Sequence, residues 1–308
     1  MNTTNNIEPY DPYELMITPS NKKGEMLFKE IEKRDKANLN LVRDLILLGA
    51  NLDWHDNDGW TALHVCAYKN RPEILRMLID AGADLNMQDN RGRTPLQYCV
   101  DWNLPEILRM LIDAGADVNI QDNIGRTALH VSAVKNHPEI LGLLIDAGAD
   151  LNIQGNDGWT ALHVSAYRNR PEITKMLIDA GADVNMQDIF GQTVLHKCAR
   201  WNSPEIARML LDAGADVNIQ HNVGMTALHR CAYKNHPEIA RMLIDAGADL
   251  NIQNNNGTTA LHWCAFNNHP EIARMLLDAG ADKTIPNNRG TLPYELAESK
   301  ELKELLKV

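Results

Sequence analysis

The chain has 308 residues, with 30 lysines and arginines against 41 aspartates and glutamates, and a formal net charge of −11 at pH 7. This excess of negative charge argues against nucleic acid or an anionic membrane surface as the main partner. Charged residues interrupt every apolar run within a few positions, and the N-terminus lacks the pattern of a secretory signal. We therefore expect neither a membrane span nor secretion through a signal peptide.

The first 22 residues are rich in asparagine, threonine and proline, a composition that predicts a disordered tail over 1–22. Residues 23–56 have the pattern of a degenerate helix pair. Leu27, Ile31 and Leu45 are expected to face inward, and charged residues are expected to cover the outside, as in the N-terminal cap of a repeat array. Trp54, near the end of this segment, is predicted to lie in the core.

From residue 57 onward the chain repeats itself every 33 residues without an insertion. One glycine series runs from Gly59 to Gly290 and a second from Gly49 to Gly280, both with this period. A fixed period of this length is typical of a repeat solenoid. A C-terminal cap over 288–308, with helices at 293–297 and 300–308, is expected to close the array. The seven full repeats span 57–89, 90–122, 123–155, 156–188, 189–221, 222–254 and 255–287.

Each repeat has the signals of two short helices. Thr61 suits the N-cap of a first helix, and Asn70 suits its end because asparagine tolerates the left-handed conformation. Pro72 and Glu73 then favour the first turn of a second helix, which Gly82 ends. An inward stripe is predicted on this second helix at Ile74, Met77, Leu78 and Ala81. Ion pairs are predicted on its outer face, among Glu73, Arg76 and Asp80.

The pattern Gly-x-Thr-Ala/Pro-Leu-His, two helices and Ala-Gly-Ala-Asp-x-Asn resembles the ankyrin repeat over roughly residues 24 to 308. Asparagine replaces the usual glycine between the helices, and a proline precedes the Glu-Ile of the second helix. The resemblance implies an all-α solenoid, elongated and curved, in which each repeat is a helix-turn-helix followed by a β-turn loop. It also implies a concave groove in which members of the family bind protein partners.

A chain made only of such repeats, and rich in asparagine, is similar to the stand-alone ankyrin proteins of giant DNA viruses and intracellular bacteria. From this we expect a cytoplasmic or nuclear protein, in the host cytoplasm if it is viral or bacterial. We expect a monomer. The identity of its partner, its organism and its pathway stay open.

Histidine recurs at one position in six of the seven repeats and cysteine at another in five, but neither predicts chemistry. Neighbouring repeats stack about 8–10 Å apart, too far for two imidazoles to share a zinc ion or for two cysteines to form a disulfide. Each histidine is expected to bind its own threonine cap and the adjacent loop, as the resemblance implies. No nucleotide-binding, metalloprotease or nucleophile motif is present. We therefore predict no catalytic residue, no metal and no cofactor, and the protein is not expected to be an enzyme.

A longer period is also present, because repeats four to six copy repeats one to three at a distance of 99 residues. Trp159 corresponds to Trp60, and Trp201 corresponds to Trp102. Recent genetic duplication explains this copying and is the favoured interpretation. The alternative is that the chain has two equivalent binding segments for a partner that is itself repeated.

Positions that vary from repeat to repeat are free of the demands of the fold, and they cluster in the loop turn and at the end of the first helix. Four of the six tryptophans lie there, although aromatic residues make up only 5% of the chain. Exposed Trp, Tyr and Arg dominate binding hot spots. Some of these rings could instead pack only against neighbouring repeats. The predicted partner-binding residues are Trp60, Tyr68, Arg93, Trp102, Arg126, Trp159, Tyr167, Phe190, Trp201, Met225, Tyr233 and Phe266.

These observations predict a non-catalytic scaffold or adaptor that binds a protein along the concave groove. Alanine at Trp60 and Trp159 is expected to abolish binding with little change in stability. The alternative is a substrate or decoy of a host modifying enzyme, since Leu78 to Asn86 resembles the motif that asparaginyl hydroxylases modify in ankyrin repeats. A purely structural role, bridging the loop backbone, is the favoured explanation of these asparagines. They are Asn86, Asn119, Asn152, Asn185, Asn218 and Asn251.

Overall fold

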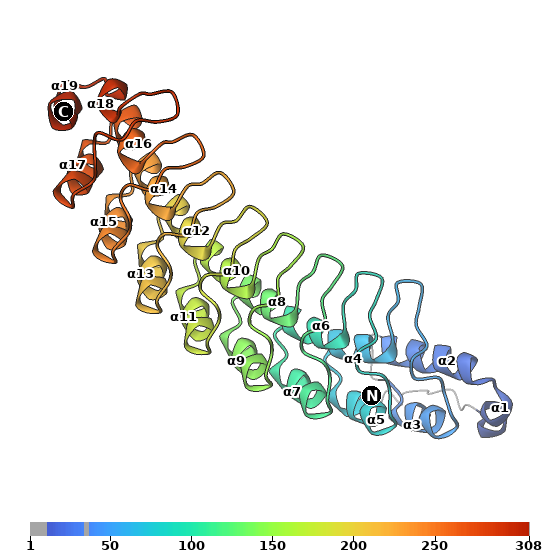
Figure 1. The fold of residues 1–308 in the computed structure, drawn as a ribbon. Coiled ribbons are helices and arrows are strands. Elements are labelled where there is room, and N and C mark those ends of the chain that lie inside the picture. The colour runs from blue at the N-terminus through green and yellow to red at the C-terminus, as the bar shows by residue number, and fades with distance from the viewer. Residues whose placement is uncertain (1–10, 34–36, 308) are drawn as a thin grey trace, which may run out of the picture. The chain divides into compact units, whose positions relative to one another are not determined.

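The structure is a computed structural model that describes residues 11–33 and 37–307 (Figure 1). These residues form nineteen helices, and their only β-bridge joins His55 to Thr61. The chain divides into two compact units, 1–150 and 151–308, which we describe one at a time. In the first unit the helices are α1 (Pro12–Ile17), α2 (Ser20–Glu32), α3 (Leu39–Leu47), α4 (Ala62–Lys69), α5 (Pro72–Asp80), α6 (Pro95–Asp101), α7 (Pro105–Asp113), α8 (Ala128–Lys135) and α9 (Pro138–Asp146).

In the second unit the same helix pairs continue. They are α10 (Ala161–Tyr167), α11 (Pro171–Asp179), α12 (Val194–Trp201), α13 (Pro204–Asp212), α14 (Ala227–Lys234), α15 (Pro237–Asp245), α16 (Ala260–Asn267), α17 (Pro270–Asp278), α18 (Pro293–Leu296) and α19 (Lys300–Leu306). The prediction of an all-α repeat solenoid is therefore confirmed within each unit.

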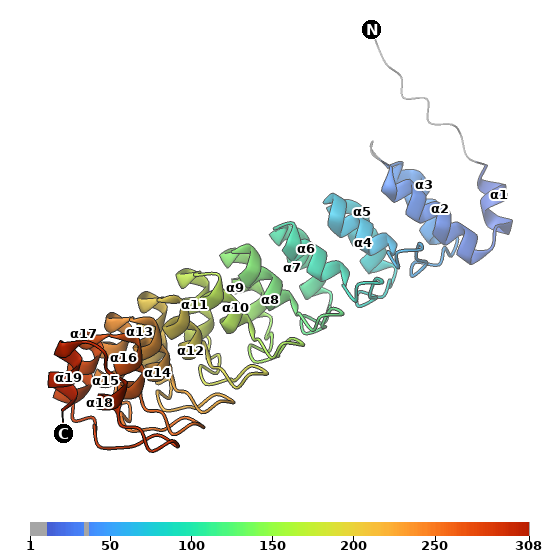
Figure 2. The ribbon, with the colours of Figure 1, turned by 90° about the horizontal axis from the view of Figure 1, so that it is seen from above.

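Two layers of helices form each unit. First helices contact first helices, as α4 contacts α6 and α12 contacts α14, and second helices contact second helices, as α5 contacts α7 and α13 contacts α15. The loops project beside the row of first helices, away from the second helices (Figure 1). Figure 2 shows, from above, that the helix pairs of each unit follow one another in chain order. The ends of the first helices and the bases of the loops therefore lie on one side of each unit.

The helix boundaries follow the predicted capping residues. The Thr61 side chain and the His64 side chain form a capping box at the start of α4. At the other end, Asn70 has a φ of 54°, and asparagine adopts the same left-handed conformation in all seven repeats. Pro72 occupies the first turn of α5, where its missing N–H costs nothing.

The inward stripe of the second helix is only partly the predicted one. Ile74 and Leu78 are buried as expected, but Leu75 completes the stripe, while Met77 is half-buried and Ala81 is exposed. Ala81 is the C-cap of a helix of only nine residues, so it has already left the packed face.

The ion pairs predicted for Glu73, Arg76 and Asp80 are also absent among the described residues. On the second helices, the pair at this spacing is Lys175–Asp179, at 2.7 Å. Long side chains on an exposed face gain little from such pairing, because water screens the charges and the ordered side chains lose entropy.

Successive loops stack directly on one another. The Asn90 N–H donates to the Asp58 carbonyl at 2.9 Å, one repeat back in the chain. Gly59 has a φ of 82°, and a Cβ there would lie 2.8 Å from the Asn90 nitrogen. All eight glycines of the first series have a positive φ, and at six of them an added Cβ would also meet the next loop: Gly59, Gly92, Gly158, Gly191, Gly224 and Gly257.

The N-terminal segment corrects the predicted tail. The Asp11 carboxylate accepts from the Tyr13 N–H at 2.9 Å and caps α1, and Leu15 is only 3% exposed. The Asn51 N–H donates to the Ser20 carbonyl at 3.0 Å and ties the start of α2 to the cap. The prediction of disorder is therefore wrong for residues 11–22. It failed because an average over composition gives single capping residues little weight. For residues 1–10 the same prediction falls outside the described residues. At the other end, Leu302 and Leu306 of α19 are fully buried, as expected of a cap.

Candidate protein-binding surface

In five of the repeats a buried histidine joins the first helix to the following loop, and Gln97 does so in α6. The Thr61 N–H donates to His64 Nδ1 at 3.1 Å, so the hydrogen lies on Nε2, which donates to the Arg93 carbonyl at 2.9 Å. Burial lowers the pKa of the equivalent His163 and His196 to about 4. These imidazoles are neutral at pH 7 and have the hydrogen bonds that the sequence predicted, so they stabilise the frame on which the surface is built.

The cysteines are likewise part of the packed core. All five are buried and unpaired with one another. Burial raises the pKa of the Cys198 thiol to about 12, so a nucleophilic thiolate is not populated near neutral pH. Over residues 11–33 and 37–307, no group of three or more His, Cys, Asp and Glu side chains could hold a metal ion.

Four aromatic rings form a continuous cluster in the first unit. Trp60 contacts Tyr98 edge-on with ring centroids 4.7 Å apart, and contacts Tyr68 at 5.3 Å. Tyr68 in turn contacts Trp102 at 5.3 Å. Tyr68 is 43% exposed and Trp102 is 55% exposed, whereas Trp60 is half-buried. The outer two rings are thus available to a partner, and the inner Trp60 packs against one of them, Tyr68.

Charges beside this first cluster are paired within the unit. Asp101 accepts from Arg93 at 2.6 Å and lies 3.1 Å from the Lys135 ammonium. Burial opposes ionisation of Asp101, but hydrogen bonds from Lys135 and Arg93 outweigh it and lower its pKa. Arg126 pairs with Asp122 at 3.0 Å. The surface around Trp102 therefore has little uncompensated charge.

The corresponding cluster in the second unit has a lysine at its centre. Trp159 and Trp201 each lie 5.1 Å from the Tyr167 ring. The Lys197 ammonium lies 5.1 Å from the Trp159 ring centroid and 5.9 Å from that of Trp201. It also lies 2.6 Å from an Asp188 carboxylate oxygen, and both side chains are buried. Lys197 thus takes the place of Tyr98, whose hydroxyl donates to the Asp89 carboxylate at 2.6 Å.

Cations extend along the exposed rim of this second cluster. The Arg168 guanidinium lies 5.7 Å from the Tyr167 ring centroid, and that of Arg200 lies 5.2 Å from the Trp201 centroid. One repeat further on, the Lys234 ammonium lies 5.2 Å from the Tyr233 ring. These are cation–π distances, in which an aromatic face stabilises a charge that stays accessible to water.

The predicted partner-binding residues differ widely in exposure. Trp60, Arg93, Arg126 and Trp159 are half-buried. Met225 is only 7% exposed, so the expectation that it faces outward is wrong; its carbonyl accepts from His196. The exposed members are Tyr68, Trp102, Tyr167, Phe190, Trp201, Tyr233 and Phe266.

Sequence reasoning missed the residues that hold the exposed rings in place. They occupy one position of the first helix, which carries Tyr98, Lys197, Arg230 and Trp263 in four of the repeats and valine in the other three. Trp263, for example, contacts both Tyr233 and Phe266, at 5.1 and 6.3 Å. Variation at this position was visible in the sequence and was the signal that could have identified it.

The six asparagines link neighbouring loops through their side chains. The Asn86 Oδ1 accepts from the Asp117 N–H at 2.9 Å. The same bond joins each of the other five to the backbone 31 residues further on. The bridging role favoured from the sequence is therefore present, and modification of these side chains stays a prediction.

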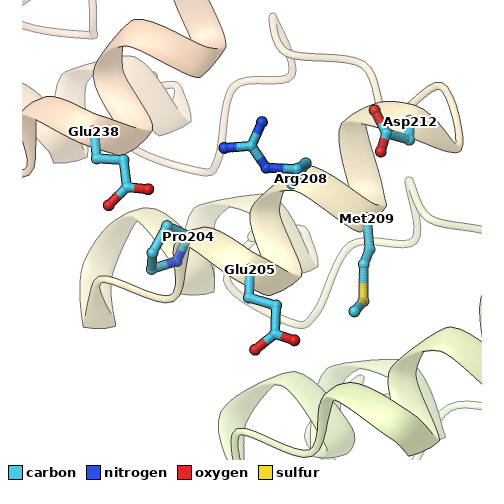
Figure 3. Close-up of a pocket in the computed structure, with 6 residues that line it drawn as sticks. All are labelled: Pro204, Glu205, Arg208, Met209, Asp212 and Glu238. Atoms are coloured by element: carbon cyan, nitrogen blue, oxygen red, sulfur yellow. The ribbon is translucent and has the colours of Figure 1, made fainter.

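A hollow lies between the second helices α13 and α15, apart from the aromatic clusters. Pro204, Glu205, Arg208, Met209 and Asp212 of α13 line it, and Glu238 extends from α15 toward α13 (Figure 3). It is lined by mixed charges and contains no aromatic ring. It therefore lacks the side chains that usually dominate protein binding.

Among the described residues, no helix is long and apolar enough to cross a membrane.

The family model described as "Ankyrin repeats (3 copies)" matches residues 33–122, 114–188, 176–254 and 195–287. Among solved structures, the chain is similar to the ankyrin repeat domain of Bcl-3, which is described as a unique member of the IkappaB protein family. The identity is 27%, the match covers 82% of this chain and 100% of that one, and the TM-score is 0.63.

A comparison with curated proteins gives no match. The family match and the paired helices with stacked loops agree, and ankyrin repeats indicate a protein–protein interaction scaffold. This chain belongs to the ankyrin-repeat family.

Proposed function

We propose that this chain is a non-catalytic scaffold that binds a protein partner through the aromatic rings at the ends of its first helices. The observation that carries the proposal is that Trp102 and Trp201 remain 55% and 43% exposed while each packs edge-on against a neighbouring tyrosine, Tyr68 or Tyr167. Large apolar rings kept in water cost free energy. Held rigid, they also lose little conformational entropy when a partner covers them.

The magnitude is sufficient for binding. A tryptophan or tyrosine buries 150–250 Å² when fully covered, so about half of a ring is roughly 100 Å². At about 25 cal/mol per Å², covering that area contributes about 2–3 kcal/mol per ring. This is the size of a binding hot spot, and two such rings lie beside each other in each cluster.

The exposed rings are the ones to test. Trp60 and Trp159 are half-buried and contact two or more rings each, so their removal would disturb the fold as well as any binding. The better variant combines Trp102→Ala with Trp201→Ala. Its matched control combines Arg109→Ala with Arg208→Ala, exposed positions on the second helices of the same two repeats.

Affinity purification followed by mass spectrometry tests the proposal. The tryptophan variant is expected to lose the proteins that the wild type and the arginine control both retain. Its thermal unfolding is expected to stay close to that of the control. Retention of the same proteins by the tryptophan variant would refute the proposal.

A further inference from the structure

The first helices of the second unit carry an unusual balance of charge. The helices α10, α12 and α14 contain no aspartate or glutamate. Together with Arg168, just after α10, they carry five cations: Arg168, Lys197, Arg200, Arg230 and Lys234. In a chain with a net charge of −11, this row is a local reversal of sign.

Only one of these cations has a carboxylate partner in the part of the chain that the structure describes. Lys197 pairs with Asp188, whereas Arg168, Arg200 and Lys234 are exposed and lie over aromatic rings. Behind them, the Arg230 guanidinium lies 3.2 Å from His221 Nε2. Burial, and to a lesser extent the nearby charge of Arg200, lower the pKa of Arg230.

The first unit provides an internal comparison, because its residues correspond at a distance of 99 positions. Asp101 stands where the second unit has Arg200, and it neutralises Arg93 and Lys135. Lys135 itself corresponds to Lys234, which has no such carboxylate nearby. The duplicated segments thus share their tryptophans but have diverged in charge.

We infer that the exposed side chains of Tyr167, Arg168, Arg200, Trp201, Tyr233 and Lys234 form a surface that binds an acidic segment of the partner protein, one in which carboxylates alternate with aromatic or aliphatic residues. We call it the cationic aromatic surface. The inference rests on the proposed function and names the chemistry of the partner at this site. A carboxylate meets each cation, and apolar side chains cover the parts of the rings that the cations leave exposed.

The surroundings favour an acidic peptide over a nucleic acid. The neighbouring loops expose Phe190 and Val223, at 58% and 54%, and these apolar side chains suit a peptide. The net charge of −11 also opposes a long polyanion, while a short acidic segment interacts mainly with the local cations.

Selection of a random displayed peptide library on the full chain, at low salt, tests the inference. Enriched peptides are expected to combine Asp or Glu with Trp, Phe or Leu. One variant carries Arg168→Gln, Arg200→Gln and Lys234→Gln. Its control carries Arg76→Gln, Arg109→Gln and Arg241→Gln, which removes the same charge from exposed positions on the second helices. Each exposed charge pair changes affinity by roughly 1.4- to 5-fold, so the first variant should bind an enriched peptide about tenfold more weakly, and the control should not.

Several outcomes would overturn the inference: neutral or basic enriched peptides, no enrichment at all, equal weakening in both variants, or tighter binding of single-stranded oligothymidylate than of any peptide. A further variant separates this failure from failure of the proposed function. If neutral peptides are enriched and Trp201→Ala abolishes their binding, the aromatic scaffold stands and only the charge inference fails. If binding is unaffected by Trp201→Ala as well, both fail.

Discussion

The buried pair Lys197–Asp188 allows a prediction whose size follows from the structure. The two side chains are 6% and 0% exposed and lie 2.6 Å apart. Removing one partner of a buried pair costs about 3–5 kcal/mol, because the other charge is left uncompensated. Asp188 keeps hydrogen bonds from the N–H groups of Phe190 and Gln192. The loss of stability in Lys197→Met should therefore be at the lower end of that range, about 3 kcal/mol.

The chain itself supplies the rescue. In the first unit, Tyr98 occupies the position of Lys197, contacts the corresponding tryptophan and donates to Asp89 at 2.6 Å. Lys197→Tyr should therefore restore a donor to Asp188 and cost less than about 1 kcal/mol. The difference between the two variants isolates the polar contact from the packing of the side chain.

Hydrogen exchange of the α12 amides is the assay, because repeats open locally and a global midpoint would average over the array. A loss of about 3 kcal/mol should speed exchange about a hundredfold in Lys197→Met, and the change should be small in Lys197→Tyr.

The dependence on pH provides a second readout. Burial raises the pKa of Asp188, but its hydrogen bonds, above all that from Lys197, hold it below its usual value. The stability this provides is complete above the unfolded pKa of about 3.9 and is lost as the pH falls through the folded pKa. The difference in α12 exchange rate between wild type and Lys197→Met should therefore become smaller in that pH range. Equal exchange rates in the two variants, or a gap independent of pH, would refute the reasoning.

Three further predictions concern the frame and its loops. Burial lowers the pKa of His196 to about 4, so the stability that the neutral imidazole provides is complete above the unfolded pKa of about 6.5 and is lost as the pH falls toward 4. The variant His196→Gln, which copies Gln97, should make the free energy of unfolding in urea depend less on pH between pH 7 and 5. Gly59→Ala should lower the melting temperature more than Gly82→Ala, since both have positive φ but only at Gly59 would the new Cβ meet backbone; equal losses would count against stacked loops. If the chain is an asparaginyl hydroxylase substrate, peptides containing Asn86 or its counterparts should gain the mass of one oxygen, and unmodified peptides from cells that express the enzyme would exclude that alternative.

The sequence predicted most of the fold, because the repeat period and the capping residues are local signals. Thr61, Asn70 and Pro72 each act within one turn of helix, so their positions alone predict the helix boundaries. The buried stripe of the second helix was harder to predict from the sequence, since the inward position of Leu75 depends on how neighbouring repeats pack. The helix at Asp11 was missed because one capping side chain has little weight in an average composition.

The candidate site was predictable in its location but not in its organisation. Variation between repeats identified Trp102 and Trp201 correctly as exposed rings. It could not distinguish them from Trp60, because exposure depends on which ring the next repeat brings alongside. The contact of Lys197 with Trp159 joins residues from adjacent repeats, and such a contact is determined by stacking rather than by spacing in the sequence.

Site-specific photo-cross-linking in cells tests the central claim most directly. A photoreactive residue in place of Trp102 or Trp201 is expected to capture a protein partner, because these side chains stand at the exposed end of each cluster. The same residue in place of Arg109 or Arg208, on the second helices, should capture none. Cross-links formed only from the second-helix positions would show that the partner binds the opposite side, and would contradict this account.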